Sequence, residues 1–264
     1  MASALADRVN QAALLDAAGV GQDATQRLAA VRDAIPGRIV FTTSFGLEDQ
    51  AITHLIATAG LDIALATLDT GRLFPQTYDV WRETERRYGL RIAAYVPEGG
   101  ALEMLVAAQG IYGFYDSVAQ RHACCDVRKV RPLVRALAGA SGWVTGLRGA
   151  QSQHRTAMNL VSYDTARGLV KANPLFDWSR EDVTAFVARH DVPVNTLHAS
   201  GFPSIGCAPC TRAVAPGEDE RAGRWWWETG DQTNHKECGL HVSADGRFVR
   251  VAAPDSPREG MADR

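Results

Sequence analysis

The stretch RIVFTTSFGLEDQ, residues 38–50, determines which fold we expect for this chain. Residues 38–43 are rich in β-branched and aromatic side chains, which predicts a buried strand. Ser44 and Gly46 then form a turn, and a helix is expected from about Leu47 to Ala59. A buried strand that passes through a small turn into a helix is the repeating unit of an open α/β sheet.

The same order of strand, turn and helix continues along the chain. Further strands are expected within 61–70, at 91–96, from residue 142 and near 169–176, and further helices at 75–89, 101–109, 127–139 and 179–190. Pro75 suits the first turn of its helix, and Ser179 is a good N-cap. Alternation at this spacing predicts an α/β fold, a mostly parallel twisted sheet with helices on both faces.

The regular pattern ends near Ser200, where an irregular segment rich in Gly, Pro and Trp begins. No internal repeat or low-complexity block divides the chain. We therefore expect one α/β domain over residues 1–215, with a helical segment at its N-terminus, and a mobile C-terminal tail over residues 216–264 that belongs to the same domain.

The composition narrows the classes of function. The chain has 264 residues, of which 46% are hydrophobic, and a net charge of −2, so nothing suggests a nucleic-acid or membrane surface. No apolar run approaches the ~20 residues of a membrane span, and the N-terminus lacks the layout of a signal peptide. The five cysteines are therefore expected to be reduced thiols in the cytoplasm.

Three loops follow the ends of predicted parallel strands, where ligands bind in sheets of this kind. They are TSFGLEDQ, LDTGRLFP and TGLRGAQSQHR, beginning at residues 43, 68 and 145. Each could present backbone N–H groups to an anion, and Arg148 and Arg155 add positive charge to the third. We expect a phosphate-bearing ligand, although the glycines match neither the dinucleotide fingerprint nor the Walker loop.

Four of the five cysteines form two tight pairs, Cys124 with Cys125 and Cys207 with Cys210. Four thiolates suit either a tetrahedral zinc ion or an iron–sulfur cluster. Adjacent cysteines rarely direct both sulfurs at one small ion, so the spacing favours a [4Fe–4S] cluster. Lys129 lies four residues after Cys125, on the same helical face, where it could offset the negative charge of the cluster.

Taken together, these motifs resemble the assimilatory adenylyl-sulfate (APS) and phosphoadenylyl-sulfate (PAPS) reductases, which have the adenine nucleotide α-hydrolase-like fold. The resemblance runs from about Phe41 to His241, and its motifs include SFGLED, LDTGRLFP, CCDVRK, TGLR, CAPC and KECGLH. The two cysteine pairs indicate the branch that contains an iron–sulfur cluster. This resemblance implies an oxidoreductase of sulfate assimilation and cysteine biosynthesis, which reduces APS to sulfite and AMP with thioredoxin or a glutaredoxin-like dithiol.

The resemblance also implies the roles of individual residues. Cys238 would attack the sulfur of APS and hold an S-sulfocysteine intermediate. The other catalytic residues would be Lys129, Arg221, Arg224 and His241. The nucleotide would contact Ser44, Phe45, Gly46, Glu48, Asp49, Leu68, Asp69, Thr70, Gly71, Arg148, Gln151 and Arg155. One cluster per subunit would be bound by Cys124, Cys125, Cys207 and Cys210.

Alternatives remain at this point. PAPS could be the substrate, instead of APS or in addition to it, and the oligomeric state is open, a homo-oligomer included. An ATP-using thiolation enzyme on the same fold would carry an SGGxDS loop, whereas this chain has SFGLED at residues 44–49. A zinc-binding interaction module without catalytic activity would not explain the three anion loops or the thiol of Cys238.

Overall fold

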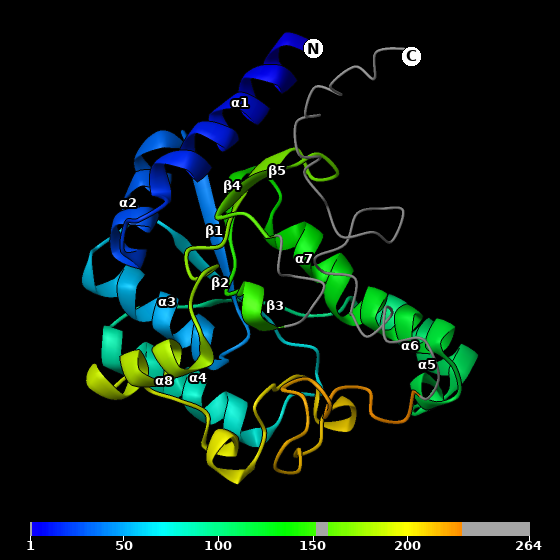
Figure 1. Ribbon diagram of the computed structural model, residues 1–264. Helices are drawn as coiled ribbons and strands as arrows, with labels where there is room; N and C mark the ends of the chain where they lie inside the picture. Colours follow the sequence, from blue (N-terminus) through cyan, green and yellow to red (C-terminus); the bar gives the residue numbers. More distant parts are fainter. Residues whose placement is uncertain (1, 152–157, 229–264) are drawn as a thin grey trace, which may run out of the picture.

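The computed structural model describes residues 2–151 and 158–228 (Figure 1). Its strands are β1 (Arg38–Thr43), β2 (Ala64–Leu68), β3 (Ala93–Tyr95), β4 (Ala140–Val144), β5 (Val161–Asp164) and β6 (Leu169–Ala172). Its α-helices are α1 (Ala2–Gly19), α2 (Ala24–Ala34), α3 (Leu47–Thr58), α4 (Pro75–Tyr88), α5 (Gly99–Gln109), α6 (Val118–Cys125), α7 (Arg131–Ala136) and α8 (Arg180–Arg189). None of the described helices is long and apolar enough to cross a bilayer.

The strands form one sheet in the order β3-β2-β1-β4-β6-β5. All neighbours are parallel except β5, which pairs antiparallel with β6. The mostly parallel sheet is as predicted, but the short edge strand β5 was not. The strand expected near 169–176 is also shorter, because the chain turns after Ala172, where the N–H of Phe176 donates to the carbonyl of Asn173.

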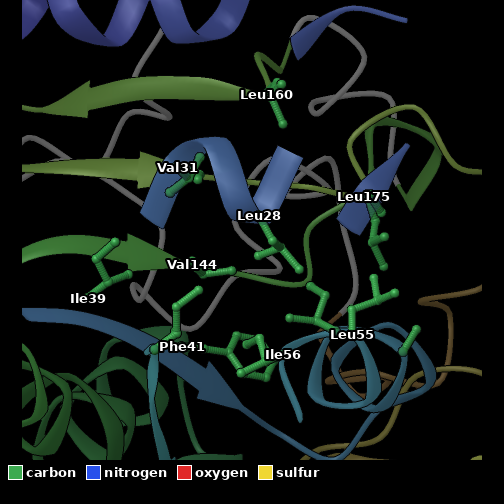
Figure 2. Close-up of a cluster of buried hydrophobic side chains, with 14 of the residues drawn as sticks. Leu28, Val31, Ile39, Phe41, Leu55, Ile56, Val144, Leu160 and Leu175 are labelled. Atoms are coloured by element: carbon green, nitrogen blue, oxygen red, sulfur yellow. The ribbon is translucent and has the colours of Figure 1, made fainter. Parts of the chain in front are cut away.

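Alternate residues of β1 face opposite sides of the sheet, so this strand contributes to two cores. Ile39 and Phe41 belong to the larger core, which packs against α2, α3 and α8. Figure 2 shows them in that core with Leu28 of α2 and Leu55 of α3. Val40 lies on the other face against α7. Helices therefore cover both faces of the sheet, as the alternation of elements predicts (Figure 1).

Local signals set the ends of several helices. Ser179 and Asp182 form a capping box at the start of α8, and Pro75 occupies the first turn of α4. Helix α4 ends at Gly89, whose φ of 62° lies in the left-handed region that glycine adopts without strain. These boundaries agree with the sequence-based ones.

The helix predicted at 127–139 has an irregular start. A π-helical turn over Asp126–Val130 joins α6 directly to α7, with the Arg131 N–H donating to the Asp126 carbonyl five residues back. Pro132 supplies no N–H and its ring would crowd the carbonyl of an α-helical turn, so the wider turn fits this sequence. As a result, Cys124, Cys125 and Lys129 lie on one continuous helical element.

Candidate functional site

A cavity of about 220 Å³ lies at the carboxyl ends of β1, β2 and β4; we call it the nucleotide cavity. All three predicted loops contribute to its wall. Of the residues predicted to contact a nucleotide, those that line it are Ser44, Phe45, Gly46, Glu48, Asp49, Leu68, Thr70 and Gln151. The position is the one at which parallel α/β sheets bind ligands.

The first loop is held in an uncommon backbone conformation. Phe45 has a φ of 61°, in the left-handed region that non-glycine residues seldom occupy, and its ring stacks on Trp81 at a centroid distance of 5.5 Å. The carboxylate of Asp49 accepts hydrogen bonds from the backbone N–H and the hydroxyl of Ser44, both at 2.6 Å. Burial raises the pKa of Asp49 to about 6, although the bonds from Ser44 oppose this shift.

The second loop connects the nucleotide cavity with the cysteines. Thr70 lines the cavity, and its hydroxyl lies 3.3 Å from the sulfur of Cys207. Asp69 accepts hydrogen bonds from the Gly71 N–H at 2.9 Å and from the Tyr78 hydroxyl at 2.7 Å. Asp69 and Gly71 thus shape this loop from outside the lining of the cavity.

The third loop approaches the first so closely that it requires glycine. A Cβ atom on Gly146 would lie 2.1 Å from Oδ1 of Asp49. Arg148 was predicted to contact the nucleotide, but its buried side chain lies behind the wall, paired with Glu48 and Glu220. Arg155 lies outside the described residues.

Three cations that the sequence singled out line the nucleotide cavity: Lys129, Arg221 and Arg224. Arg224 is buried, and its Nη1 lies 3.3 Å from the Ser204 hydroxyl and 3.4 Å from the Ile205 carbonyl, to which it donates. Positive side chains around a closed cavity at strand ends can bind several anionic oxygens at once. Cys238 and His241 lie outside the described residues.

The four paired cysteines line a second, smaller cavity, which we call the thiol cavity. Cys124 and Cys125 end α6, while Cys207 and Cys210 flank the short turn Ala208–Cys210. All four are buried. The N–H of Ala208 donates to the Arg72 carbonyl at 2.8 Å, and the Tyr115 hydroxyl donates to the Pro209 carbonyl at 2.7 Å. These bonds fix the turn opposite α6.

Charges around the thiol cavity act unequally on the cysteines. Burial, together with the neighbouring Cys207, raises the pKa of Cys210 to about 12, although Lys129 and Arg224 oppose this shift. Burial also acts to raise the pKa of Cys207, but Lys129, the hydrogen bond with Thr70 and Arg224 outweigh it, so this pKa is lowered. Thiolates that repel one another in this way would be stabilised by a bound cation.

The thiol cavity fits an iron–sulfur cluster in its chemistry. Four sulfurs surround it, and Arg72, Arg121, Arg128 and Lys129 supply positive charge. Within the described ranges, the buried Trp225 Nε1 and Arg128 Nε have no hydrogen-bond acceptor, and sulfur atoms in the cavity could serve as one. No three His, Cys, Asp or Glu side chains in that part of the chain lie close enough together to hold a single metal ion.

Lys129 and Trp225 line both cavities, so the two share a wall. The predicted tail, 216–264, thus begins within the described part of the chain, where Trp225 is only 1% exposed and packs beside the thiols. Trp227 packs partly buried against the same cluster, whereas Trp226 is exposed.

Several residues that line the nucleotide cavity were missed in the sequence. Threonines at or just after the strand ends form part of its floor, namely Thr42, Thr43, Thr67 and Thr145. A polar residue that closes an apolar strand was the available signal. His198, Ser204, Ile205, Gly206 and Glu220 come from the irregular region after α8, where no periodicity indicated a role.

Comparisons with known proteins agree with this arrangement. Residues 38–213 match the family described as the phosphoadenosine phosphosulfate reductase domain. The chain is 52% identical to an adenosine 5'-phosphosulfate reductase of Agrobacterium fabrum, with 91% of each protein covered. It is 54% identical to that of Allochromatium vinosum, over 77% of this chain and 78% of the relative. The crystal structure of a phosphoadenylyl-sulfate (PAPS) reductase from Candida auris, in a phosphate complex, has a TM-score of 0.66 and 26% identity, covering 77% of this chain and 96% of that one.

Proposed function

Because the chain belongs to the phosphoadenosine phosphosulfate reductase family, we propose that it reduces adenosine 5'-phosphosulfate to sulfite and AMP in sulfate assimilation. The observation that carries this proposal is the pair of adjoining cavities. One is lined by three strand-end loops and three cations, and the other is lined by four thiols. Relatives about half identical over most of the chain are named for this substrate.

The substrate would bind with its adenosine over the strand ends and its phosphosulfate toward the cationic wall. Leu68 and Trp143 provide apolar surface there, while Lys129, Arg221 and Arg224 supply positive charge. Charge moves onto the AMP phosphate as the sulfur–oxygen bond breaks. Fixed cations at that position stabilise the transition state more than the ground state.

Cys238 would be the nucleophile, because the four thiols of the thiol cavity are buried and a cluster would occupy them. Its thiolate attacks the sulfuryl sulfur, the bond to the phosphate oxygen breaks, and AMP leaves with the electron pair. His241 would contribute to the binding of the phosphosulfate. Both residues lie outside the described ranges.

Release of sulfite needs two electrons from a dithiol. One thiolate of the reductant attacks the Cys238 sulfur and displaces sulfite, and the second thiolate then resolves the mixed disulfide. The reductant leaves as a disulfide and Cys238 returns as a thiolate. Thioredoxin or a glutaredoxin-like protein, in the cytoplasm, would supply this dithiol.

Cys124, Cys125, Cys207 and Cys210 would hold a [4Fe–4S] cluster. It would contribute a fixed charge beside the phosphosulfate. Lys129 would be positioned by its place in the shared wall, where it neighbours both the thiols and the substrate oxygens.

The choice between APS and PAPS is tested by measuring sulfite release from each nucleotide with thioredoxin present. We expect kcat/KM for APS to exceed that for PAPS by about 10²-fold or more, because a 3'-phosphate would require cations of its own. Comparable values would identify an enzyme that uses both. Turnover of neither nucleotide would contradict the proposed function.

The role of Cys238 is tested by mixing enzyme and APS without any reductant. We expect about one AMP per active site and a sulfite-sized increase in protein mass on the peptide containing Cys238, since the covalent intermediate stops there. Thioredoxin should remove the adduct. Cys238→Ser should lose the adduct and fall by about 10³-fold or more in turnover while still binding AMP. An adduct on any of the four paired cysteines would identify a different nucleophile.

A further inference from the structure

Arg148 joins two carboxylates that line the nucleotide cavity, although its own side chain is only 1% exposed and lies behind the wall. Its Nε donates to Glu48 Oε1 at 2.8 Å. Its Nη2 donates to the two carboxylate oxygens of Glu220 at 3.0 and 3.3 Å. The planar guanidinium therefore bridges two acidic residues whose positions in the sequence are 172 residues apart (220 − 48).

Resting on the proposed function, we propose that Arg148 is a positioning residue for nucleotide binding and not a ligand of the substrate phosphate. It places Glu220, and with it the arginine-bearing turn at 220–224, against the start of α3. It also neutralises two carboxylates that would otherwise face an anionic substrate.

On one side of the bridge, Glu48 lies in the first turn of α3, next to the strained loop at Phe45. Gln151 strengthens this side, since its Nε2 donates to Glu48 Oε1 at 3.1 Å and its Oε1 accepts from the Arg148 N–H at 3.2 Å. The first and third loops are thereby joined through polar side chains at the edge of the nucleotide cavity.

On the other side, Glu220 directly precedes Arg221 in a tight turn. The N–H of Arg221 donates to Asp219 Oδ1 at 2.8 Å, and the N–H of Arg224 donates to the Arg221 carbonyl at 2.9 Å. Because these bonds make the turn a single unit, displacing the Glu220 side chain also displaces the two arginines that line the cavity. Arg180, at the start of α8, pairs with the same carboxylate from a more exposed position.

Within the described residues, the ion pairs of this network match in charge. Glu48 and Glu220 carry two negative charges, and Arg148 and Arg180 carry two positive ones. Two carboxylates that line the cavity are thereby neutralised beside Lys129, Arg221 and Arg224, which line it as well. Without Arg148, Glu220 would be held only by the more exposed Arg180, and Glu48 would lose its cationic partner, so the turn at 220–224 would no longer be fixed against the start of α3.

The test is a double-variant cycle read out by the equilibrium dissociation constant for AMP. Arg148→Gln should weaken AMP binding about tenfold or more, Glu220→Gln should also weaken it, and the double variant should bind AMP no more weakly than Arg148→Gln alone, because both substitutions break the same bridge. If Arg148 were a direct phosphate ligand, Glu220→Gln would instead leave AMP binding unchanged or strengthen it, since it removes a negative charge near the anion. Unchanged or tighter AMP binding by Glu220→Gln would overturn the proposal.

Two further variants keep the test decisive. Arg148→Lys guards against a folding failure, because lysine keeps the positive charge. A single ammonium cannot reproduce the planar fork of arginine, so wild-type AMP affinity in this variant would contradict the bridge.

Arg180→Gln is the matched control. We expect AMP affinity to fall at most threefold, since Arg148 still holds Glu220, and a loss of affinity equal to that of Arg148→Gln would also contradict the bridge. Failure of the proposed function is distinguishable, because wild-type protein would then neither bind AMP nor turn over APS.

Discussion

The nucleotide cavity is enclosed by the ends of parallel strands, whereas the thiol cavity is enclosed by a helix end and an irregular turn. In the first, backbone geometry sets the positions of residues such as Thr43 and Thr67, because strand ends in one sheet meet at one edge. In the second, the sulfurs of Cys124 and Cys207 meet only because the irregular segment packs against α6. We conclude that the thiol cavity depends more strongly on its own side chains and on whatever they bind.

The largest expected effect therefore belongs to the thiol cavity. Replacing any one of Cys124, Cys125, Cys207 or Cys210 with Ser should lower the iron content about tenfold or more, and sulfite production should fall with it. Iron per chain and visible absorbance in anaerobically purified protein measure this. Cys238→Ser is the control and should keep its iron. One zinc and no iron in the wild-type protein would show that the metal was assigned wrongly.

Lys129 lies in the wall that the two cavities share, so substituting it tests the role of that wall. Lys129→Met should lower kcat/KM for APS about 100-fold, because a fixed cation is lost beside the developing charge. Arg128→Met is the matched control, since Arg128 lines only the thiol cavity and its Nη1 donates to the Thr70 carbonyl. Arg128→Met should lower kcat/KM for APS less than Lys129→Met does. The reverse order would contradict the role given to Lys129.

Two glycines near the nucleotide cavity allow an effect on AMP binding to be separated from an effect on stability. A Cβ on Gly206 would lie 2.3 Å from Nη2 of Arg224, the far end of a long side chain, whereas a Cβ on Gly223 would lie 2.3 Å from the Arg212 carbonyl oxygen of the backbone. Gly206→Ala should therefore weaken AMP binding about tenfold while changing the free energy of unfolding by less than about 1 kcal/mol. Gly223→Ala should destabilise the protein by more than that. Thermal unfolding and AMP titration distinguish the two outcomes.

The smallest effect is expected at Asp49, where burial of the charged carboxylate lowers the free energy of unfolding. Its pKa is raised from 3.8 to about 6, so the charged form opposes folding; this cost is absent below about pH 4 and complete above about pH 6. Asp49→Asn should therefore raise the free energy of unfolding at pH 7.5 by about 1 to 3 kcal/mol, since two pKa units correspond to about 3 kcal/mol. Urea unfolding measures this gain, which should fade toward pH 4. A gain that is independent of pH would point to another cause.

Local patterns in the sequence were enough to predict the strand, turn and helix that form the first wall of the nucleotide cavity. The strand at 38–43, the turn at Ser44 and Gly46, and the helix from Leu47 follow from residue types within a few positions of one another, and the structure has them as expected. The mostly parallel sheet could be predicted for the same reason, because alternation of strands and helices is a local property. The family resemblance was likewise readable from short motifs.

Only the tertiary structure decided what the irregular region does. It brings Glu220 and Gly206, which follow no periodicity, to the wall of the nucleotide cavity, where Glu220 pairs with the buried Arg148. The edge strand β5 was missed for a related reason, since it joins the sheet by antiparallel pairing with β6, which the alternation of strands and helices does not indicate. Motifs identify which residue types are present, but the partners of a buried charge depend on contacts between segments far apart in the chain. In the sequence Arg148 looks like a phosphate ligand, and only the structure shows that its side chain is buried and paired with Glu48 and Glu220.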